Sequence, residues 1–247
     1  MKYETPRFLD CGEAALSVEF GDSVDPVINA RVLALDACLR AAPPPGLRET
    51  TPTYRALFLR YEPLEISRDA LIAAIEGLIA PSDPPADPET LQPSARWTMP
   101  CCYDPALAED IVEAAALLGR TAHALGELHA GADYRAYMYG FAPGWCYLGG
   151  LPQALAIPRR ASPRGPTPQG AALIGGALSL IAASPMPTGW YVVGRTPERM
   201  FALRRDPPFL VAPGDAVRFE PIDAETFQAL DARAFAGETV ARREALR

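Results

Sequence analysis

Residues 139–151 read YGFAPGWCYLGGL, and this stretch decides how the C-terminal part of the chain is expected to fold. Its thirteen positions hold four glycines, one proline and four aromatic residues. Glycine permits turns in which the backbone comes close to another group, and aromatic side chains offer flat faces for that group to contact. We therefore predict tight turns lined with aromatic rings.

The same character continues on both sides, from Tyr134 to Pro221, where glycine or proline interrupts short apolar runs every few residues. Such spacing is typical of a β-barrel or sandwich built from short strands. Residues 188–197 (TGWYVVGRTP) predict a turn, a strand and a second turn. The turn residues 213–215 (PGD) before AVRFEPI predict a closing hairpin.

Residues 158–170, PRRASPRGPTPQG, place three arginines between prolines. An arginine on a stiffened loop loses less conformational entropy when it binds a carboxylate or phosphate than one on a mobile loop. The segment is therefore a candidate anion-binding loop.

The N-terminal part has a different pattern, in which strands alternate with helices. We predict strands at 14–20 and 54–61 and helices at 27–39 and 67–79, the first helix after Asp25-Pro26 and the second after Ser67, both typical helix starts. Five prolines in residues 81–93 (PSDPPADPETLQP) then exclude a packed helix and predict a linker or long loop. This gives two domains, a small α/β domain at 1–92 and a second domain at 93–247.

The second domain is expected to begin with a strand from Arg96 and helices at 104–118 and 121–129, and to end in a helical tail at 224–247. Between these lead-in and tail segments lies the glycine- and proline-rich region. The predicted fold class is therefore α+β, a small α/β domain followed by a β-barrel domain.

The charge is unevenly distributed along the chain. The formal net charge is −7, but residues 133–220 carry nine arginines and five acidic residues, whereas residues 1–132 carry 10 basic and 20 acidic residues. A local basic stretch in an acidic protein favours a small anion or an acidic protein surface over nucleic acid. Because Lys2 is the only lysine, Schiff-base, phosphate-loop and biotin-carrying lysines are excluded, so bound ATP or carried biotin is expected on a partner.

Self-sufficient catalytic motifs are missing from the sequence. It has no G-x-S-x-G, phosphate-loop, H-E-x-x-H or C-x-x-C pattern. Its two histidines, His123 and His129, are six positions apart and would not share one helix face, so we expect no metal site. We also expect no membrane segment, a cytoplasmic location and free, mostly buried cysteines. No residue is identified as a nucleophile.

The segments GFAPGWCYLGGL, PRRASPR, TGWYVVGRTP and PPFLVAPGDAVRFEPI resemble those of one known family. It includes the B-type subunit of 5-oxoprolinase, the kinase inhibitor KipI, and the allophanate hydrolase subunit 1 or carboxyltransferase C/D-type domains of urea carboxylases. Residues 11–35 resemble the opening of that family and MPCCYDPALAEDI resembles the lead-in to its barrel, so the resemblance covers nearly the whole chain.

The resemblance implies a cyclophilin-like β-barrel in the second domain and a protein that is inactive alone. It implies a paired cyclophilin-like subunit, either the C-type subunit of 5-oxoprolinase or the allophanate hydrolase subunit 2 type, with a LamB/YcsF-type subunit as a further candidate. The first expected function is an ATP-dependent 5-oxoprolinase that opens 5-oxo-L-proline to L-glutamate. The alternatives are a biotin-dependent carboxyltransferase subunit of the urea carboxylase/amidolyase type and a KipI-like histidine kinase inhibitor.

The sequence departs from the family pattern at one point. Family members carry a segment like AGSVGIAGxQTGIYP, whereas Leu178-Ser179-Leu180 stands here in place of Gln-Thr-Gly. The residues expected to bind substrate are the arginines and aromatic or glycine positions of the turns: Arg159, Arg164, Arg195, Phe141, Gly144, Trp145, Tyr147 and Trp190.

Overall fold

The computed structural model describes residues 1–79 and 92–246. Within them the chain divides into two compact units, Met1–Gln92 and Pro93–Arg247. The proline-rich segment predicted as a linker lies almost entirely outside the described residues. None of the described helices is long and apolar enough to cross a lipid bilayer.

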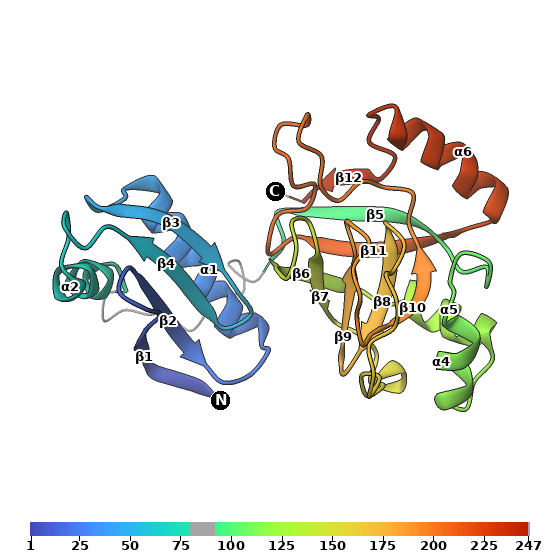
Figure 1. The fold of residues 1–247 in the computed structure, drawn as a ribbon, viewed down its shortest axis with the longest axis horizontal. Coiled ribbons are helices and arrows are strands. Elements are labelled where there is room, and N and C mark those ends of the chain that lie inside the picture. Colours follow the sequence, from blue (N-terminus) through green and yellow to red (C-terminus); the bar gives the residue numbers. More distant parts are fainter. Residues whose placement is uncertain (80–91, 247) are drawn as a thin grey trace. The chain divides into compact units, whose positions relative to one another are not determined.

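In residues 1–79 the N-terminal unit is a four-stranded antiparallel sheet with two helices (Figure 1). Its strands follow the order β1-β2-β4-β3 across the sheet. The elements are β1 (Lys2–Asp10), β2 (Ala15–Gly21), α1 (Pro26–Ala41), β3 (Leu47–Pro52), β4 (Ala56–Tyr61) and α2 (Arg68–Leu78).

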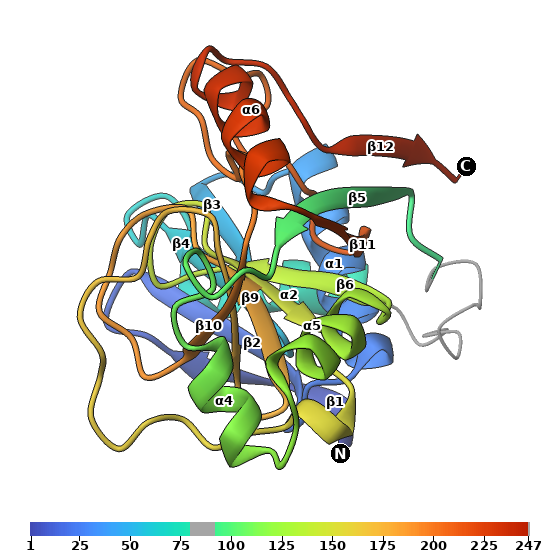
Figure 2. The ribbon, with the colours of Figure 1, turned by 90° about the vertical axis from the view of Figure 1, so that its right-hand side faces the viewer.

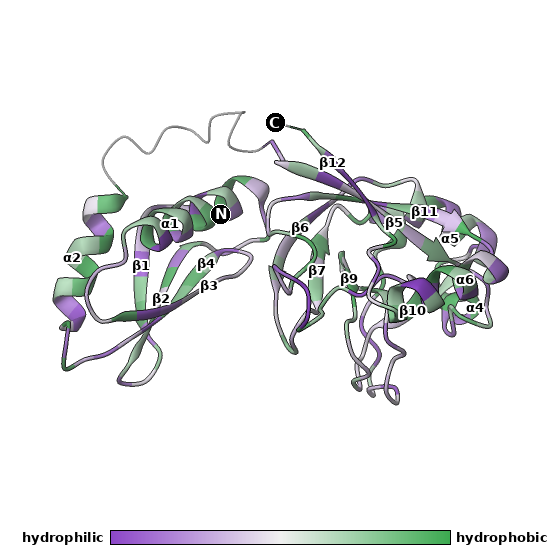
Figure 3. Ribbon diagram, turned by 90° about the horizontal axis from the view of Figure 1, so that it is seen from above, coloured by the Kyte–Doolittle hydropathy of each residue, from purple (hydrophilic) through white to green (hydrophobic). Residues whose placement is uncertain are grey.

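Both helices start where the sequence predicts. The Asp25 side chain accepts hydrogen bonds from the backbone of Val27 and Ile28, and Ser67 accepts one from Ala70. Apolar residues of both helices pack on the apolar faces of β2 and β4. Figure 3 shows hydrophobic and hydrophilic residues alternating along α1, as expected for a helix with one face on a sheet. Strands β1 and β3 were not predicted, because they lie at the sheet edges, where few of their side chains are buried.

The C-terminal unit is a β-barrel, which confirms the predicted fold class. Seven strands follow the order β10-β8-β9-β7-β6-β11-β5, a pairing between β10 and β5 closes the ring, and β12 adds to the outer edge of β5. The strands are β5 (Ala95–Cys102), β6 (Tyr134–Tyr139), β7 (Cys146–Gly149), β8 (Ala171–Gly175), β9 (Leu178–Ile181), β10 (Tyr191–Arg195), β11 (Ala216–Ile222) and β12 (Arg242–Ala245).

The helices of this unit are α4 (Ile111–Leu117), α5 (Ala122–Ala130) and α6 (Ala224–Phe235), with a short 3₁₀ turn at Gln153–Leu155. Figures 1 and 2 place α6 on one side of β5 and β11 and place α4 and α5 on the other. A single apolar cluster joins the barrel strands with α4 and α5. Helix α5 begins where the sequence predicts, and the structure shows that the Thr121 side chain caps it by accepting a hydrogen bond from the Ala124 backbone.

The helix predicted from residue 104 begins later. The Asp104 side chain accepts a hydrogen bond from the Ala106 backbone and holds a turn instead. The Asp110 N–H then donates to the carbonyl of Val192 in β10, at 2.9 Å, rather than to a helical carbonyl. Helix α4 therefore starts only at Ile111.

Two further sequence predictions are wrong in part. The turn at 213–215 does not close a hairpin, because β11 pairs in parallel with β5 and antiparallel with β6. Asp215 explains this, since its carboxylate accepts hydrogen bonds from the Ala95 backbone and the Trp97 indole at the start of β5. The C-terminal tail is helical only to Phe235. Gly237, with φ +100°, follows the helix, and β12 then pairs with β5.

Candidate functional site

Residues 158–170, called the arginine-rich loop below, lie against the segment before β10. Backbone N–H groups of Arg160, Arg164 and Thr167 donate to the carbonyls of Gly189, Thr188 and Met186, at 2.7, 2.9 and 3.0 Å. The loop is therefore an irregular ribbon fixed along its length, as the prolines predict.

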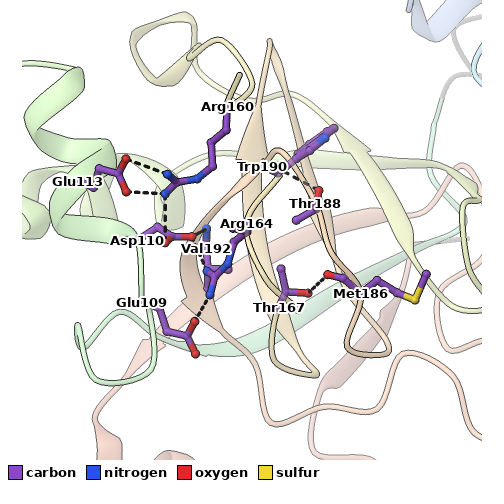
Figure 4. Close-up of polar contacts among 10 residues, drawn as sticks. All are labelled: Glu109, Asp110, Glu113, Arg160, Arg164, Thr167, Met186, Thr188, Trp190 and Val192. Atoms are coloured by element: carbon purple, nitrogen blue, oxygen red, sulfur yellow. Dashed lines mark hydrogen bonds and ion pairs between the residues drawn. The ribbon is translucent and has the colours of Figure 1, made fainter. Parts of the chain in front are cut away.

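Three carboxylates at the start of α4 hold two of the loop arginines (Figure 4). Arg160 binds Glu113 and lies 3.2 Å from Asp110, and Arg164 binds Asp110 and Glu109. The hydrogen bond from Arg160 to Glu113 raises the pKa of the Arg160 guanidinium. The charges of Arg160 and Arg164 are thus already compensated, which makes them anchors of the loop.

Asp110 connects this cluster to the barrel. Its carboxylate also accepts a hydrogen bond from the Val192 N–H, at 2.8 Å, and only 12% of its side chain is exposed. Arg160 and the three acids were not predicted as site residues. The sequence does show three acids within five residues. Only the tertiary fold shows that these acids lie opposite the loop with three arginines.

Arg159 is in a different situation from its neighbours. Its guanidinium carbon lies 5.0 Å from the centre of the Trp190 ring. Among the described residues, no carboxylate lies within ion-pair distance of it. Tyr147 meets Trp190 edge to face at 5.9 Å, and burial raises the pKa of the Tyr147 hydroxyl while the charge of Arg159 partly opposes this. The structure thus brings three of the predicted residues together.

The aromatic turn before β7 forms a second group. Phe141 has a left-handed backbone, with φ +68°; the residue is 66% exposed, and its ring packs edge to face on Trp145. Trp145 is buried and its indole N–H donates to Ser184. Gly144, at φ +79°, lies so close to Phe201 that an added Cβ would be 2.3 Å from the Phe201 Cβ. The predicted tight turn is present, but Trp145 belongs to the core.

Arg195 lies at the opposite end of β10 from Trp190. Its Nε donates to the Gln169 carbonyl, at 3.1 Å, and its guanidinium lies 5.4 Å from the Phe227 ring centre on α6. The predicted residues therefore do not form one site. Arg159, Trp190 and Tyr147 lie together, Phe141, Gly144 and Trp145 share the turn, and Arg164 and Arg195 lie apart.

The Leu178–Leu180 stretch is part of the buried barrel wall. The Ser179 hydroxyl donates to the Leu173 carbonyl and therefore accepts from His129 Nε2, at 3.2 Å. His129 Nδ1 then accepts from the Tyr103 hydroxyl, at 2.9 Å. Burial lowers the pKa of His129 to about 3, so the ring is neutral.

The cysteines of the barrel are also unsuited to catalysis. Burial raises the pKa of Cys101 and of Cys146 to about 12. A thiol nucleophile needs a lowered pKa and access. No group of three or more potential metal ligands is assembled in residues 1–79 and 92–246.

Comparison with known proteins agrees with the fold. Residues 6–211 match the family model described as carboxyltransferase domain, subdomain C and D. The B-type subunit of 5-oxoprolinase from Bacillus subtilis is 28% identical over 229 residues, covering 88% of this chain and 93% of that protein. Relatives from Escherichia coli and Haemophilus influenzae carry the same name.

Solved structures with a similar fold are also known. The crystal structure of TTHA0988 has a TM-score of 0.74 and 34% identity over 85% of this chain, but the chain spans only 40% of that longer protein. The urea amidolyase of Kluyveromyces lactis, at 17% identity, has a TM-score of 0.76 over 97% of this chain and 16% of that protein. At that identity the likeness concerns the fold alone.

Proposed function

The chain belongs to the family described as carboxyltransferase domain, subdomain C and D, and from that premise we propose that it is the B-type subunit of an ATP-dependent 5-oxoprolinase. In this reaction the lactam of 5-oxo-L-proline is hydrolysed to L-glutamate together with ATP. The observation that carries the proposal is the match to the B-type 5-oxoprolinase subunit of Bacillus subtilis over 93% of that protein.

The geometry supports a subunit that binds and positions rather than one that reacts. His129, Cys101 and Cys146 are buried in the barrel core. Burial lowers the pKa of His129 and raises the pKa of the two thiols, so all three side chains are neutral at neutral pH. Such groups are poor general bases and poor nucleophiles at neutral pH. The proposal therefore places the reacting groups on partner subunits and treats this chain as inactive alone.

We propose the partners to be a paired cyclophilin-like subunit and a LamB/YcsF-type subunit, with ATP bound on one of them. The chain supports this division, because its only lysine, Lys2, belongs to the N-terminal strand β1 and its sequence has no phosphate loop. We also propose a cytoplasmic location.

The experiment is reconstitution. The chain is co-purified with the candidate partners, and 5-oxo-L-proline-dependent release of phosphate from ATP is measured with and without it. Activity that requires the chain supports the proposal, and equal activity of the partners alone contradicts it.

The family description keeps biotin-dependent carboxyl transfer as a second candidate. The same preparation is therefore assayed with a biotin carboxylase, carboxybiotin carrier and urea. Carboxylation of urea that requires the chain, without 5-oxo-L-proline hydrolysis, would replace the first proposal with this one. No contact in the described barrel favours the kinase inhibitor alternative.

A further inference from the structure

We propose that Arg159, held over the face of Trp190 beside Tyr147, binds the carboxylate of a small substrate. The inference deepens the proposed function and rests on it for the identity of that substrate, 5-oxo-L-proline. It assigns the binding role to one of the three arginines in the loop and gives the other two a supporting role.

The charge of Arg159 is available for a ligand. Its neighbour Arg160 is bound by Glu113 and Asp110, and Arg164 is bound by Asp110 and Glu109. Around Arg159 the described parts of the chain provide the ring of Trp190 and no carboxylate. A guanidinium that lies over an aromatic face keeps its N–H edge free, and that edge fits the two oxygens of a carboxylate.

The platform beneath Arg159 is fixed. Trp190 is only 4% exposed, and it packs so closely on β8 that a Cβ on Gly175 would lie 2.8 Å from its ring. The Tyr147 ring, edge to face with Trp190, borders the platform on β7. Tyr147 lies on β7, and Trp190 directly precedes β10 and belongs to the apolar core of the barrel, so neither ring lies on a loose surface loop.

The backbone that carries Arg159 is also fixed. Pro158 precedes it, and the next residue donates its N–H to the Gly189 carbonyl at 2.7 Å while its side chain is bound by Glu113 and Asp110. A side chain on such a backbone loses less entropy on binding than one on a mobile loop. The paired arginines thus position the unpaired one.

Arg195 is the other predicted anchor without a carboxylate partner among the described residues, and it is less suited. One of its N–H groups already donates to the Gln169 carbonyl, and its guanidinium lies over Phe227 of α6. Fewer donors remain for a ligand than on Arg159.

The test uses the purified full chain and the indole fluorescence of Trp190. We expect a saturable change on titration with 5-oxo-L-proline and none with 2-pyrrolidinone, the same lactam without the carboxylate. Arg159→Ala should weaken binding by about ten-fold or more, because a charge-assisted hydrogen bond to a charged group is lost. Arg159→Lys should weaken it less, and Trp190→Phe should remove the signal.

Arg204 provides the matched control, since it is exposed, lies in another loop and also has no carboxylate partner in the described structure. Arg204→Ala should leave binding unchanged. Equal binding by wild type and Arg159→Ala, equal binding of the two lactams, or no saturable change in either the chain or the reconstituted complex would overturn the inference.

The two proposals fail separately. If carboxylate binding depends on Arg159 but the complex does not hydrolyse 5-oxo-L-proline, the proposed function is wrong and the proposed binding site stands. If the complex hydrolyses 5-oxo-L-proline equally well with Arg159→Ala, the proposed function stands and the proposed binding site is wrong.

Discussion

Asp110 and Val192 are joined by two hydrogen bonds that run in opposite directions. The Asp110 N–H donates to the Val192 carbonyl at 2.9 Å, and the Val192 N–H donates to the Asp110 carboxylate at 2.8 Å. The same carboxylate binds Arg164 and lies 3.2 Å from Arg160. One side chain thus joins α4, the arginine-rich loop and strand β10.

Asp110→Ala should therefore lower the free energy of unfolding by about 3 kcal/mol, the usual cost of removing one partner of a largely buried ion pair. Asp110→Asn, which keeps an acceptor for the Val192 N–H, should cost about 1 kcal/mol. Urea unfolding of both variants measures the difference. Equal stabilities of the two variants would contradict the role of the charge.

The pH dependence of stability should show the neutral state of His129. Its pKa in the folded chain is about 3, below the ordinary value of 6.5, so at intermediate pH the unfolded chain binds a proton that the folded chain does not. This contribution to stability is complete above pH 6.5 and is lost as the pH falls toward 3. The slope for one proton is about 1.4 kcal/mol per pH unit.

His129→Gln should flatten the stability curve between pH 6 and 4, as measured by urea unfolding at several pH values. The exposed His123 provides the control, and His123→Gln should leave the slope as it is. An NMR titration gives a second readout, in which the His129 ring signals should not move above pH 5. Movement with a midpoint near 6.5 would contradict the buried neutral ring.

The local features of the sequence were sufficient to predict part of the fold. Asp25-Pro26 and Thr121 cap helices through residues two or three positions away, so neighbouring sequence carries their signal. Glycine and proline spacing likewise predicted the barrel, because turns are local. The helix predicted from residue 104 failed because Asp110 bonds to Val192, 82 positions along the chain.

For the candidate site, too, the sequence shows local features but not contacts between distant residues. The sequence could select Arg159 and Arg164 as loop arginines, but it could not distinguish them. The carboxylates that occupy Arg164 lie 54 and 55 positions earlier in the chain. Likewise, the sequence predicts helix at residues 236–246. It cannot reveal strand β12 there, because β12 is stabilised by pairing with β5, more than a hundred residues away in the chain.

Gly144 should tolerate no larger side chain. Its φ of +79° disfavours any L-residue, and a Cβ would lie 2.3 Å from the Phe201 Cβ and 2.7 Å from the Ala183 Cβ. Gly119 is the matched control, with φ +65° and no atom within 4 Å of its ideal Cβ. Gly119→Ala should cost about 1 kcal/mol for the backbone alone, and Gly144→Ala about 3 kcal/mol because the clash is added. Thermal or urea unfolding of both variants checks this, and equal losses would exclude close packing of the turn.

The five cysteines should divide by reactivity. Cys11 and Cys38 are exposed, whereas Cys101, Cys102 and Cys146 are buried, and burial raises the pKa of each of these three thiols. Because the thiolate is the reactive form, two thiols should react rapidly with a disulfide reagent at pH 8 in the folded chain, and all five in denaturant. Cys11→Ser and Cys38→Ser together should remove the rapid phase. A third rapid thiol in the folded chain would contradict the buried barrel cysteines.

Glu198 should hold the C-terminal strand in place. Its side chain is fully buried, and one carboxylate oxygen accepts hydrogen bonds from the backbone of Val240 and Ala241, at 2.7 and 2.8 Å, directly before β12. Glu198→Ala leaves these two N–H groups without their acceptor, which should lower stability by about 2 kcal/mol. It should also remove amide hydrogen-exchange protection from β12 before the rest of the barrel.

Glu220, whose ion pair with Arg242 of β12 is exposed, is the control, because such surface pairs contribute little. Glu220→Ala should therefore leave β12 protected, and equal loss of protection in both variants would show that surface pairing, not the buried carboxylate, holds the strand.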